Sequence, residues 1–387
     1  MTVPSVNWNY PTAIKAGPGR IKELPDWCRE LGMARPLLVT DPGLAALPMI
    51  ADAVRGCRQA GLECGLFHEV KGNPTGRNVD DGVARYREGR HDGVIAFGGG
   101  SALDAAKAIA LMAGQKRPLW DFEDVGDNYL RVNVAGMAPV VAVPTTAGTG
   151  SEVGRASVIT DEAAQVKRII FHARMLPAIV ILDAELTVGL PPRITAATGM
   201  DALSHNLEAY CSPFFHPMAA GIALEGMRMI KEYLPRAVAD GADLQARQQM
   251  LVASSMGATA FQRGLGAMHA LAHPLGALYD AHHGMLNAIL MPYVLKANQH
   301  AVAPRLQALA RYLALPDDGP GAVLDWVLGL RETVGIPHTL ADIGIDDAQA
   351  ERVGRMASED PSGGTNPVAY TPDQYAELFR AAVRGIL

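Results

Sequence analysis

Short apolar runs that end in polar residues or glycine recur through the first half of the chain. Runs of this kind, with turn-forming residues at their ends, are typical of strands buried in a parallel sheet. Stretches with helical spacing lie between them, and this alternation predicts an α/β domain. The predicted strands are 12–16, 36–41, 63–69, 94–97, 139–143 and 178–182, with a hairpin at 155–160 and 168–171. The predicted helices lie near 20–31, 46–60, 77–89 and 102–113, and 114–138 is predicted to be irregular.

The second half of the chain shows no convincing strand. Leu190-Pro-Pro192 is the clearest boundary, because consecutive prolines interrupt regular structure. Beyond it, proline and glycine separate most of the predicted helices, near 193–210, 217–234, 243–261, 264–278, 284–298, 301–313, 321–334, 346–357 and 372–385. The chain has 387 residues, too many for one core. We therefore expect an α/β domain over 1–188 and an all-helical domain over 189–387.

The composition narrows the class of protein. The chain is 49% hydrophobic and 19% charged, its formal net charge is −6, and it has no basic block, so nucleic acid is not an expected partner. No apolar run reaches the length of a membrane-spanning helix, and the first ten residues do not resemble a signal peptide. The four cysteines, Cys28, Cys57, Cys64 and Cys211, show no C-x-x-C spacing. We expect reduced thiols in a cytoplasmic protein.

A glycine-rich loop follows the predicted strand at 94–97. Gly98-Gly-Gly-Ser101 leads directly into a strong helix-forming segment, with Ser101 as the expected N-cap and Asp104 completing a capping box. A strand, a glycine loop and a helix N-terminus in this order bind phosphate, because the backbone can approach the anion and the free N–H groups attract it.

Polar residues also follow two other predicted strands. Asp41 stands at a carboxyl end, where an acidic side chain can bind ribose hydroxyls and would favour NAD over NADP; the alternative is a simple turn at Asp41-Pro42-Gly43. The loop 144–152 is dense in hydroxyls and glycines and almost uncharged, which suits a cofactor groove better than a solvated linker. Lys167 could reach a cofactor hydroxyl or phosphate, although a solvated lysine is the commoner outcome.

The second half contains a candidate metal site. Asp201 and His205 are four residues apart, so both leave one face of a helix, and the same spacing links His269 and His273. Asp201, His205, His269 and His283 together offer three imidazoles and one carboxylate, which suit Fe(II), Zn, Mn, Co or Ni and leave room for an exchangeable ligand. The alternative is a solvated helix face, but the flanking residues are apolar and buried polar groups need partners.

These motifs together resemble those of the iron-dependent (group III) alcohol dehydrogenase family, over nearly the whole chain. The matching stretches are Gly98–Ser101, Pro144–Glu152, Leu190–His205, His269–Gly276, His283-Gly284 and Thr365-Asn-Pro367. The resemblance implies a Rossmann-like dinucleotide-binding domain followed by an all-α metal-binding domain, the architecture shared with dehydroquinate synthase, and a homodimer or higher homo-oligomer.

The resemblance also assigns roles to residues. It implies that the metal, Fe(II) with Zn or Mn also compatible, is held by Asp201, His205, His269 and His283. It places His273 near the nicotinamide and the metal without making it a ligand. The positions that match the family's NAD-binding residues are Asp41, Gly98, Gly99, Gly100, Ser101, Thr145, Thr146, Thr149, Ser151 and Lys167.

The expected activity is reversible hydride transfer between NAD and a primary alcohol or a small hydroxy acid, with the substrate oxygen polarised by the metal and His273 relaying the proton. The alternatives are a hydroxyacid–oxoacid transhydrogenase that retains its NAD, a lyase of the dehydroquinate synthase type, and a binding protein without turnover. No cluster of basic residues for a substrate phosphate stands beside the ligands, which disfavours the lyase.

The stretch before His269 departs from the family pattern. Many members carry Phe-x-Asn there, whereas this chain has Phe261-Gln-Arg263 and no Asn. Arg263, and also Arg155, could therefore meet an anionic substrate group, since guanidinium pairs well with carboxylate. The commoner alternative for each is an arginine on a helix surface.

Overall fold

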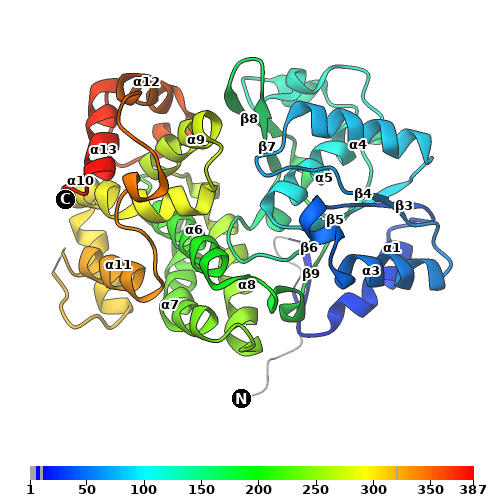
Figure 1. Ribbon diagram of the computed structural model, residues 1–387, viewed down its shortest axis with the longest axis horizontal. Coiled ribbons are helices and arrows are strands. Elements are labelled where there is room, and N and C mark those ends of the chain that lie inside the picture. The colour runs from blue at the N-terminus through cyan, green and yellow to red at the C-terminus, as the bar shows by residue number, and fades with distance from the viewer. Residues whose placement is uncertain (1–5, 9–11, 320) are drawn as a thin grey trace. The chain divides into compact units, whose positions relative to one another are not determined.

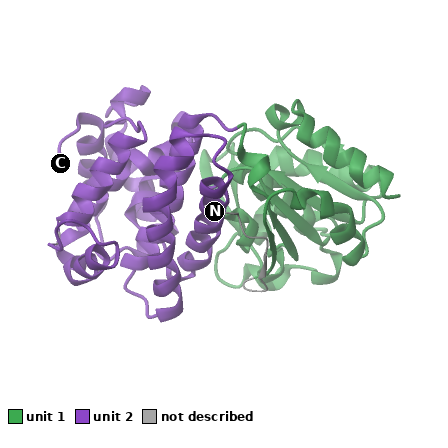
Figure 2. Cartoon of the chain, turned by 90° about the horizontal axis from the view of Figure 1, so that it is seen from below, with its two compact units in different colours: residues 1–146, 150–189 green, residues 147–149, 190–387 purple. Residues whose placement is uncertain are grey.

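The computed structural model describes residues 6–8, 12–319 and 321–387. Most of the first ten residues, which were predicted not to be a signal peptide, therefore lie outside the described residues. The chain divides into two compact units, one of residues 1–146 and 150–189 and one of residues 147–149 and 190–387 (Figure 2). No described helix is both long and apolar enough to cross a membrane.

A seven-stranded sheet organises the first unit (Figure 1), in the order β1-β2-β9-β6-β5-β3-β4. Only the first pair, β1 and β2, is antiparallel. The strands are β1 (Val6–Trp8), β2 (Ala13–Ala16), β3 (Pro36–Val39), β4 (Gly65–Phe67), β5 (Gly93–Gly98), β6 (Val140–Pro144) and β9 (Ile179–Leu182). Strand β1 was not predicted from the sequence, whereas the other six were predicted with bounds that differ by a few residues.

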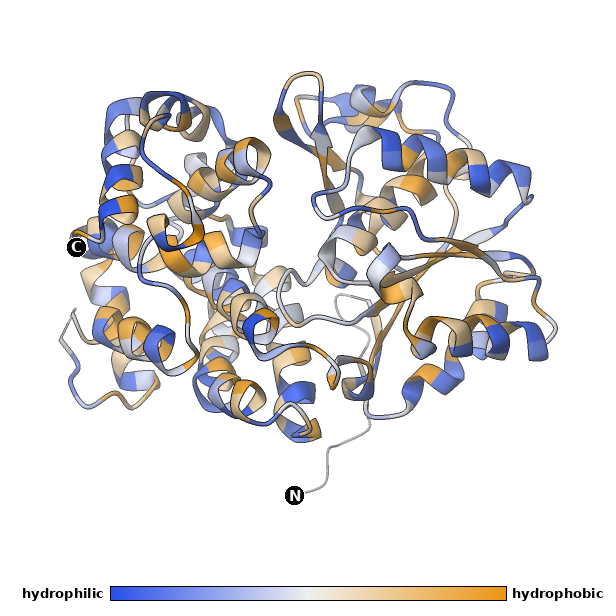
Figure 3. Ribbon diagram, in the orientation of Figure 1, coloured by the Kyte–Doolittle hydropathy of each residue, from blue (hydrophilic) through white to orange (hydrophobic). Residues whose placement is uncertain are grey.

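Helices cover the sheet because its strands are apolar on both faces, as their colour in Figure 3 shows. Alternate side chains of the strands, such as Ile95 and Phe97, share one core with α1 and α3, whereas α5 packs on β5 and β6 with α4 beside it. The helices are α1 (Leu24–Glu30), α2 (Pro42–Ala45), α3 (Pro48–Gln59), α4 (Gly76–Glu88) and α5 (Gly100–Met112).

A separate hairpin completes the first unit. It consists of β7 (Ala156–Asp161) and β8 (Val166–Phe171), which pair antiparallel. The stretch predicted to be irregular contains only short 3-10 helices: η2 (Leu119–Phe122), η3 (Asn128–Arg131) and η4 (Val134–Gly136).

The described residues after Gly189 form helices and no strand. Helix α6 (Pro192–Cys211) is buried at every position from Thr195 to Cys211, so its polar side chains lie inside the unit. The others are α7 (Pro217–Ala239), α8 (Leu244–Ala260), α9 (Ala267–Tyr279), α10 (His283–Tyr312), α11 (Ala322–Thr333), α12 (Ala350–Glu359) and α13 (Pro372–Arg384).

Two local predictions were wrong. The helices predicted at 284–298 and 301–313 are one helix, α10, because residues 296–303 contain neither proline nor glycine to interrupt it. The expected capping box of α5 does not form, since Gly99 is the N-cap and Ser101 lies in the first turn. The carboxylate of Asp104 instead accepts hydrogen bonds from Ser151 Oγ and Val158 N.

Candidate metal centre and cofactor loops

Three helices of the second unit bring four side chains together. Helix α6 carries Asp201 and His205 one turn apart, α9 carries His269 near its start, and α10 begins at His283. One ligand atom from each of the four lies within 4.8 Å of all the others. One ion bonded to each atom at about 2.0–2.2 Å would nearly span this spread.

The donor types fit a divalent transition metal. Three imidazole nitrogens and one carboxylate oxygen are a ligand set for iron, zinc or manganese, and there is no thiolate in the group. Asp201, His205 and His269 are buried, whereas the side chain of His283 is 23% exposed. The adjacent His282 serves another purpose, since its Nδ1 accepts a hydrogen bond from Met285 N and caps α10.

Asn287 is a polar residue of this group that the sequence analysis missed. It follows His283 by one helical turn, and its Nδ2 lies 2.8 Å from Asp201 Oδ1, 3.1 Å from His283 Nε2 and 3.2 Å from His269 Nε2. Its Oδ1 is buried without a hydrogen-bond partner among the described residues. The i,i+4 spacing to His283 was the only signal in the sequence that could have identified it.

Gly284 allows α10 to approach α6 closely. A Cβ at this position would lie 2.7 Å from the Ala197 carbonyl oxygen and 3.1 Å from Asp201 Cβ. Any larger residue would push the start of α10, and with it His283, away from Asp201.

Two histidines of the group have opposite pKa shifts. Burial lowers the pKa of His205 to about 4 despite the nearby Asp201 carboxylate, so this ring is neutral at pH 7. Burial also opposes a charge on His269, but Glu208 outweighs it and raises the pKa of His269. The Nδ1 of His269 donates to Glu208 Oε2 over 2.7 Å, a contact with no local sequence signal.

His273, the predicted proton carrier, lies beside the same group. Its ring stacks on that of His283, with centroids 5.5 Å apart. Its Nδ1 donates to Asp360 Oδ2 over 2.8 Å. Burial alone would raise the pKa of Asp360, but His273 and the Ser362 N–H together hold it below its usual range. Asp360 was not predicted as a site residue from the sequence, because it is 87 residues away from His273.

The middle of the loop 144–152 belongs to the helical unit. Residues 147–149, which include the predicted cofactor residue Thr149, group with it, and His205 Nδ1 donates to the Gly148 carbonyl oxygen over 3.2 Å. Gly148 packs so closely that a Cβ there would lie 2.8 Å from Thr198 Cβ. This bond leaves the Nε2 of His205 as the nitrogen available for a metal.

The other predicted cofactor residues lie mainly at the carboxyl ends of the parallel strands. Asp41, Gly98 and Thr145 follow or end β3, β5 and β6, which are neighbouring parallel strands. Ligands of open α/β sheets bind at such carboxyl ends. Gly98 has φ +150°, and a Cβ there would lie 2.7 Å from Ala102 Cβ, so only glycine suits the turn into α5. Gly99, Gly100 and Ser101 form the start of that helix, which has no side-chain cap, and Thr146 follows Thr145.

Three predicted cofactor side chains have partners within the first unit. Asp41 caps α2 through Oδ1, which accepts from Leu44 N at 2.9 Å. Ser151 donates to Asp104, which also pairs with the buried Lys107. Lys167 donates to Asn73 Oδ1 over 2.8 Å. Asp104 and Lys107, which the sequence analysis did not propose for the site, therefore hold the end of the loop 144–152.

The two arginines considered for substrate binding differ in their surroundings. Arg263 is only 6% exposed and its Nε donates to the Phe214 carbonyl oxygen over 2.7 Å, so it is not a helix-surface arginine. Arg155 is exposed at the start of the hairpin, with its guanidinium 5.8 Å from the Phe171 ring centre.

Both units of the chain match the same protein family. Residues 11–184 match the model of the iron-containing alcohol dehydrogenases, and residues 195–383 match that of the C-terminal region of the same family. The chain is 39% identical to 4-hydroxybutyrate dehydrogenase of Cupriavidus necator, with 97% of this chain and 99% of the relative covered. It is 34% identical to NAD-dependent methanol dehydrogenase of Bacillus methanolicus, with 97% and 100% covered.

The solved structures agree with this result. The crystal structure of a 1,3-propanediol oxidoreductase superposes with a TM-score of 0.90 at 34% identity and covers 99% of this chain and 100% of its own. The predicted fold class, a Rossmann-like α/β domain with an all-α C-terminal domain, is thereby confirmed. The chain belongs to the iron-containing alcohol dehydrogenase family and is a metal-dependent, NAD-linked oxidoreductase of alcohols and aldehydes.

Proposed function

We propose that this enzyme interconverts primary alcohols and aldehydes at a metal centre made of Asp201, His205, His269 and His283. The observation that carries the proposal is the convergence of these four side chains from three helices, with ligand atoms within 4.8 Å of one another. When bound, a divalent ion supplies a Lewis acid that acidifies the alcohol, and NAD accepts the hydride.

In this proposal the chain's own residues orient the reactants and move the proton. Asp360 accepts a hydrogen bond from Nδ1–H of His273, so the lone pair of the neutral ring lies on Nε2, which takes the hydroxyl proton. The Asp360 carboxylate then stabilises the imidazolium that results. Both residues are largely buried, with side chains 10% exposed, so bulk water weakens this pairing little.

The proposed NAD site combines the glycine turn between β5 and α5 with the carboxyl ends of the neighbouring strands. The uncapped start of α5 at Gly99 and Gly100 offers N–H groups to the pyrophosphate. Thr145, Thr146, Thr149 and Ser101 offer hydroxyls, whereas Ser151 and Lys167 help by fixing the surrounding loops through Asp104 and Asn73. Asp41 has a second carboxylate oxygen, beyond the one that caps α2, for a ribose hydroxyl.

The substrate is proposed to be a small molecule with a primary hydroxyl. The names of the similar proteins include 4-hydroxybutyrate, methanol and 1,3-propanediol, and each of these compounds carries its hydroxyl on a terminal carbon. The greater identity to the 4-hydroxybutyrate enzyme favours an ω-hydroxy acid among these. We also propose Fe(II) as the native metal, a cytoplasmic location and a homodimer or larger homo-oligomer.

The decisive experiment is NAD reduction by the protein loaded with Fe(II) or Zn(II), tested with primary alcohols, diols and ω-hydroxy acids side by side. We expect turnover with at least one primary hydroxyl compound, and no turnover after chelation. Preference for the hydroxy acids would identify the substrate class. Inactivity with every compound and both metals, in protein that binds one metal per chain, would contradict the proposal.

A further inference from the structure

We propose that Glu208 is a positioning residue that sets the metal affinity of the centre by fixing the ring of His269. This role rests on the proposed function, because it presupposes that His269 is a metal ligand. Glu208 matches no ligand position and lies outside the group of four, so it acts through His269 and does not touch the ion itself.

The geometry starts from one face of α6. Glu208 follows Asp201 by seven residues and His205 by three, so all three side chains leave the same face of α6, and those of Glu208 and His205 meet His269 of α9. Glu208 Oε2 accepts from His269 Nδ1 over 2.7 Å, and Glu208 Oε1 accepts from Met268 N over 2.7 Å. The Glu208 side chain is 4% exposed and that of His269 is 2% exposed.

The bond determines which nitrogen of His269 is available. An ionised carboxylate can only accept, so Nδ1 must carry the proton and the lone pair of the neutral ring lies on Nε2. Nε2 is the atom that faces the ligand group, since it lies 3.2 Å from Asn287 Nδ2. A carboxylate behind a ligating imidazole also raises the basicity of that ligand.

A capping role for Glu208 is the alternative that must be separated from this one. The N-cap of α9 is Gly266, which has no side chain, and the first N–H groups are instead satisfied by Asn366 Oδ1 at Ala267 and Glu208 Oε1 at Met268. A carboxylate at a helix N-terminus is stabilising in its own right. If capping were its only function, metal affinity would not depend specifically on its bond to His269.

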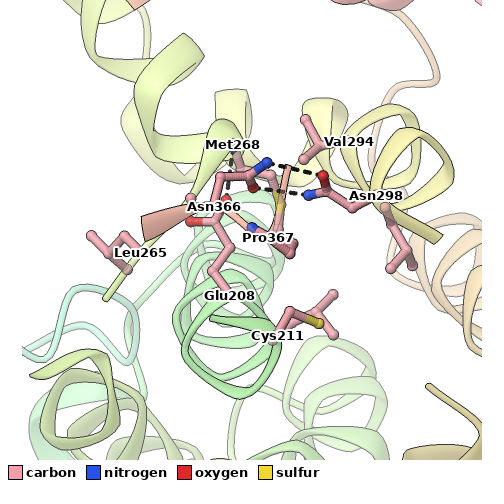
Figure 4. A pocket seen from close by; sticks show the side chains of 11 residues that line it. Glu208, Cys211, Leu265, Met268, Val294, Asn298, Asn366 and Pro367 are labelled. Carbon is pink, nitrogen blue, oxygen red and sulfur yellow. Dashed lines mark hydrogen bonds between the residues drawn. The ribbon is translucent and has the colours of Figure 1, made fainter. Parts of the chain in front are cut away.

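Substrate does not reach Glu208. The cavity beside it, lined also by Met268, Asn298 and Asn366 (Figure 4), measures about 10 Å³. That volume holds about one water molecule. Glu208 therefore cannot act as a catalytic acid or base on an alcohol.

The variant Glu208→Gln separates capping from positioning. Its amide oxygen can still accept from Met268 N–H, but its NH2 group then faces Nδ1 of His269 and favours the tautomer with the proton on Nε2. We expect Zn²⁺ affinity, measured by competition with a chromophoric chelator, to fall about 10- to 100-fold. We also expect a changed visible spectrum of bound Co²⁺.

A double-mutant cycle with His269→Ala gives the sharper test. If Glu208 acts through the ring, E208Q should change Zn²⁺ affinity less than threefold in the His269→Ala background. An equal loss in both backgrounds, or unchanged affinity in E208Q alone, would overturn the role and leave the four-ligand centre intact. If the wild-type chain bound no zinc, both the centre and this role would be wrong.

Two further variants distinguish the proposed role of Glu208 from a general loss of folding. Asn366→Ala removes the neighbouring cap of α9 without touching His269, so it should lower thermal stability but leave Zn²⁺ affinity within threefold. Glu208→Asp keeps a carboxylate and should bind zinc more tightly than E208Q. If E208Q does not fold, the cycle is run with Glu208→Asp, and a loss that persists without His269 would contradict the proposal.

Discussion

His205 and His269 carry the same ring in opposite electrostatic surroundings. Burial without a hydrogen-bonded carboxylate lowers the pKa of His205 to about 4, whereas Glu208 raises that of His269. At pH 7 His205 is therefore a neutral ring that is ready to bind a metal. His273 differs from both, because Asp360 holds its Nδ1 and it lies outside the four-residue group.

Replacement of these histidines should separate ligation from proton transfer. We expect His205→Ala to lose both metal and activity. His273→Gln should keep one metal per chain while kcat falls about 100-fold, the typical contribution of a general base. Metal content by elemental analysis and kcat from NADH formation measure the two effects. Normal activity in metal-free His205→Ala, or metal loss in His273→Gln, would contradict the assignment.

At the scale of elements, helix ends determine where the site residues stand. Helix α9 is capped by remote side chains, α10 by His282, and α8 by Asp243, whose Oδ1 accepts from Ala246 N. Asp243 also pairs with Arg236 at 2.8 Å, which joins the end of α7 to the start of α8. Burial alone would raise the pKa of Asp243, but the Ala246 N–H and Arg236 together lower it.

Asp243→Ala should destabilise the protein by about 1 kcal/mol at pH 7, the usual contribution of an N-cap. Since the pKa is lowered on folding, this stabilisation is complete above the unfolded value of about 3.9 and is lost as pH falls through the folded value. Urea denaturation of both proteins between pH 7 and 3 should show the difference shrinking below about pH 4. Glu30→Ala, which removes an exposed carboxylate, serves as the control and should show no such trend. A difference that stays constant with pH would contradict the linkage.

At the scale of the whole molecule, the metal centre joins helices that are distant in sequence. Its residues come from α6, α9 and α10, and Asp201 and Asn287 meet although they are 86 positions apart. An ion bound only by the folded protein stabilises it by about 2.7 kcal/mol when free metal is at 100 times Kd.

Metal removal should therefore lower Tm. With about 2–4 °C per kcal/mol for a unit of roughly 200 residues, the expected loss on chelation is about 5–10 °C. Differential scanning calorimetry with Zn²⁺ and with chelator measures it. His205→Ala should show a much smaller difference between the two conditions, and an equal difference would place the stabilising ion elsewhere.

The amino-acid pattern alone determined much of this protein. Apolar runs identified six of the seven strands of the main sheet, proline and glycine marked most helix ends, and the i,i+4 spacing of Asp201 and His205 predicted a shared helix face. These features are local, so they follow from backbone geometry and side-chain periodicity. The break predicted within α10 was wrong because residues 296–303 hold neither proline nor glycine, so the helix continues through them.

Only the tertiary structure decided which distant side chains meet. Glu208 contacts His269 across 61 positions, Asp360 contacts His273 across 87, and Asp104 binds Ser151 across 47. No local pattern encodes such pairs, because they depend on how whole helices and strands pack. The same holds for Gly284, whose missing side chain lets α10 reach α6. Sequence thus specifies the chemical groups and their helices, and packing places them close enough to act together.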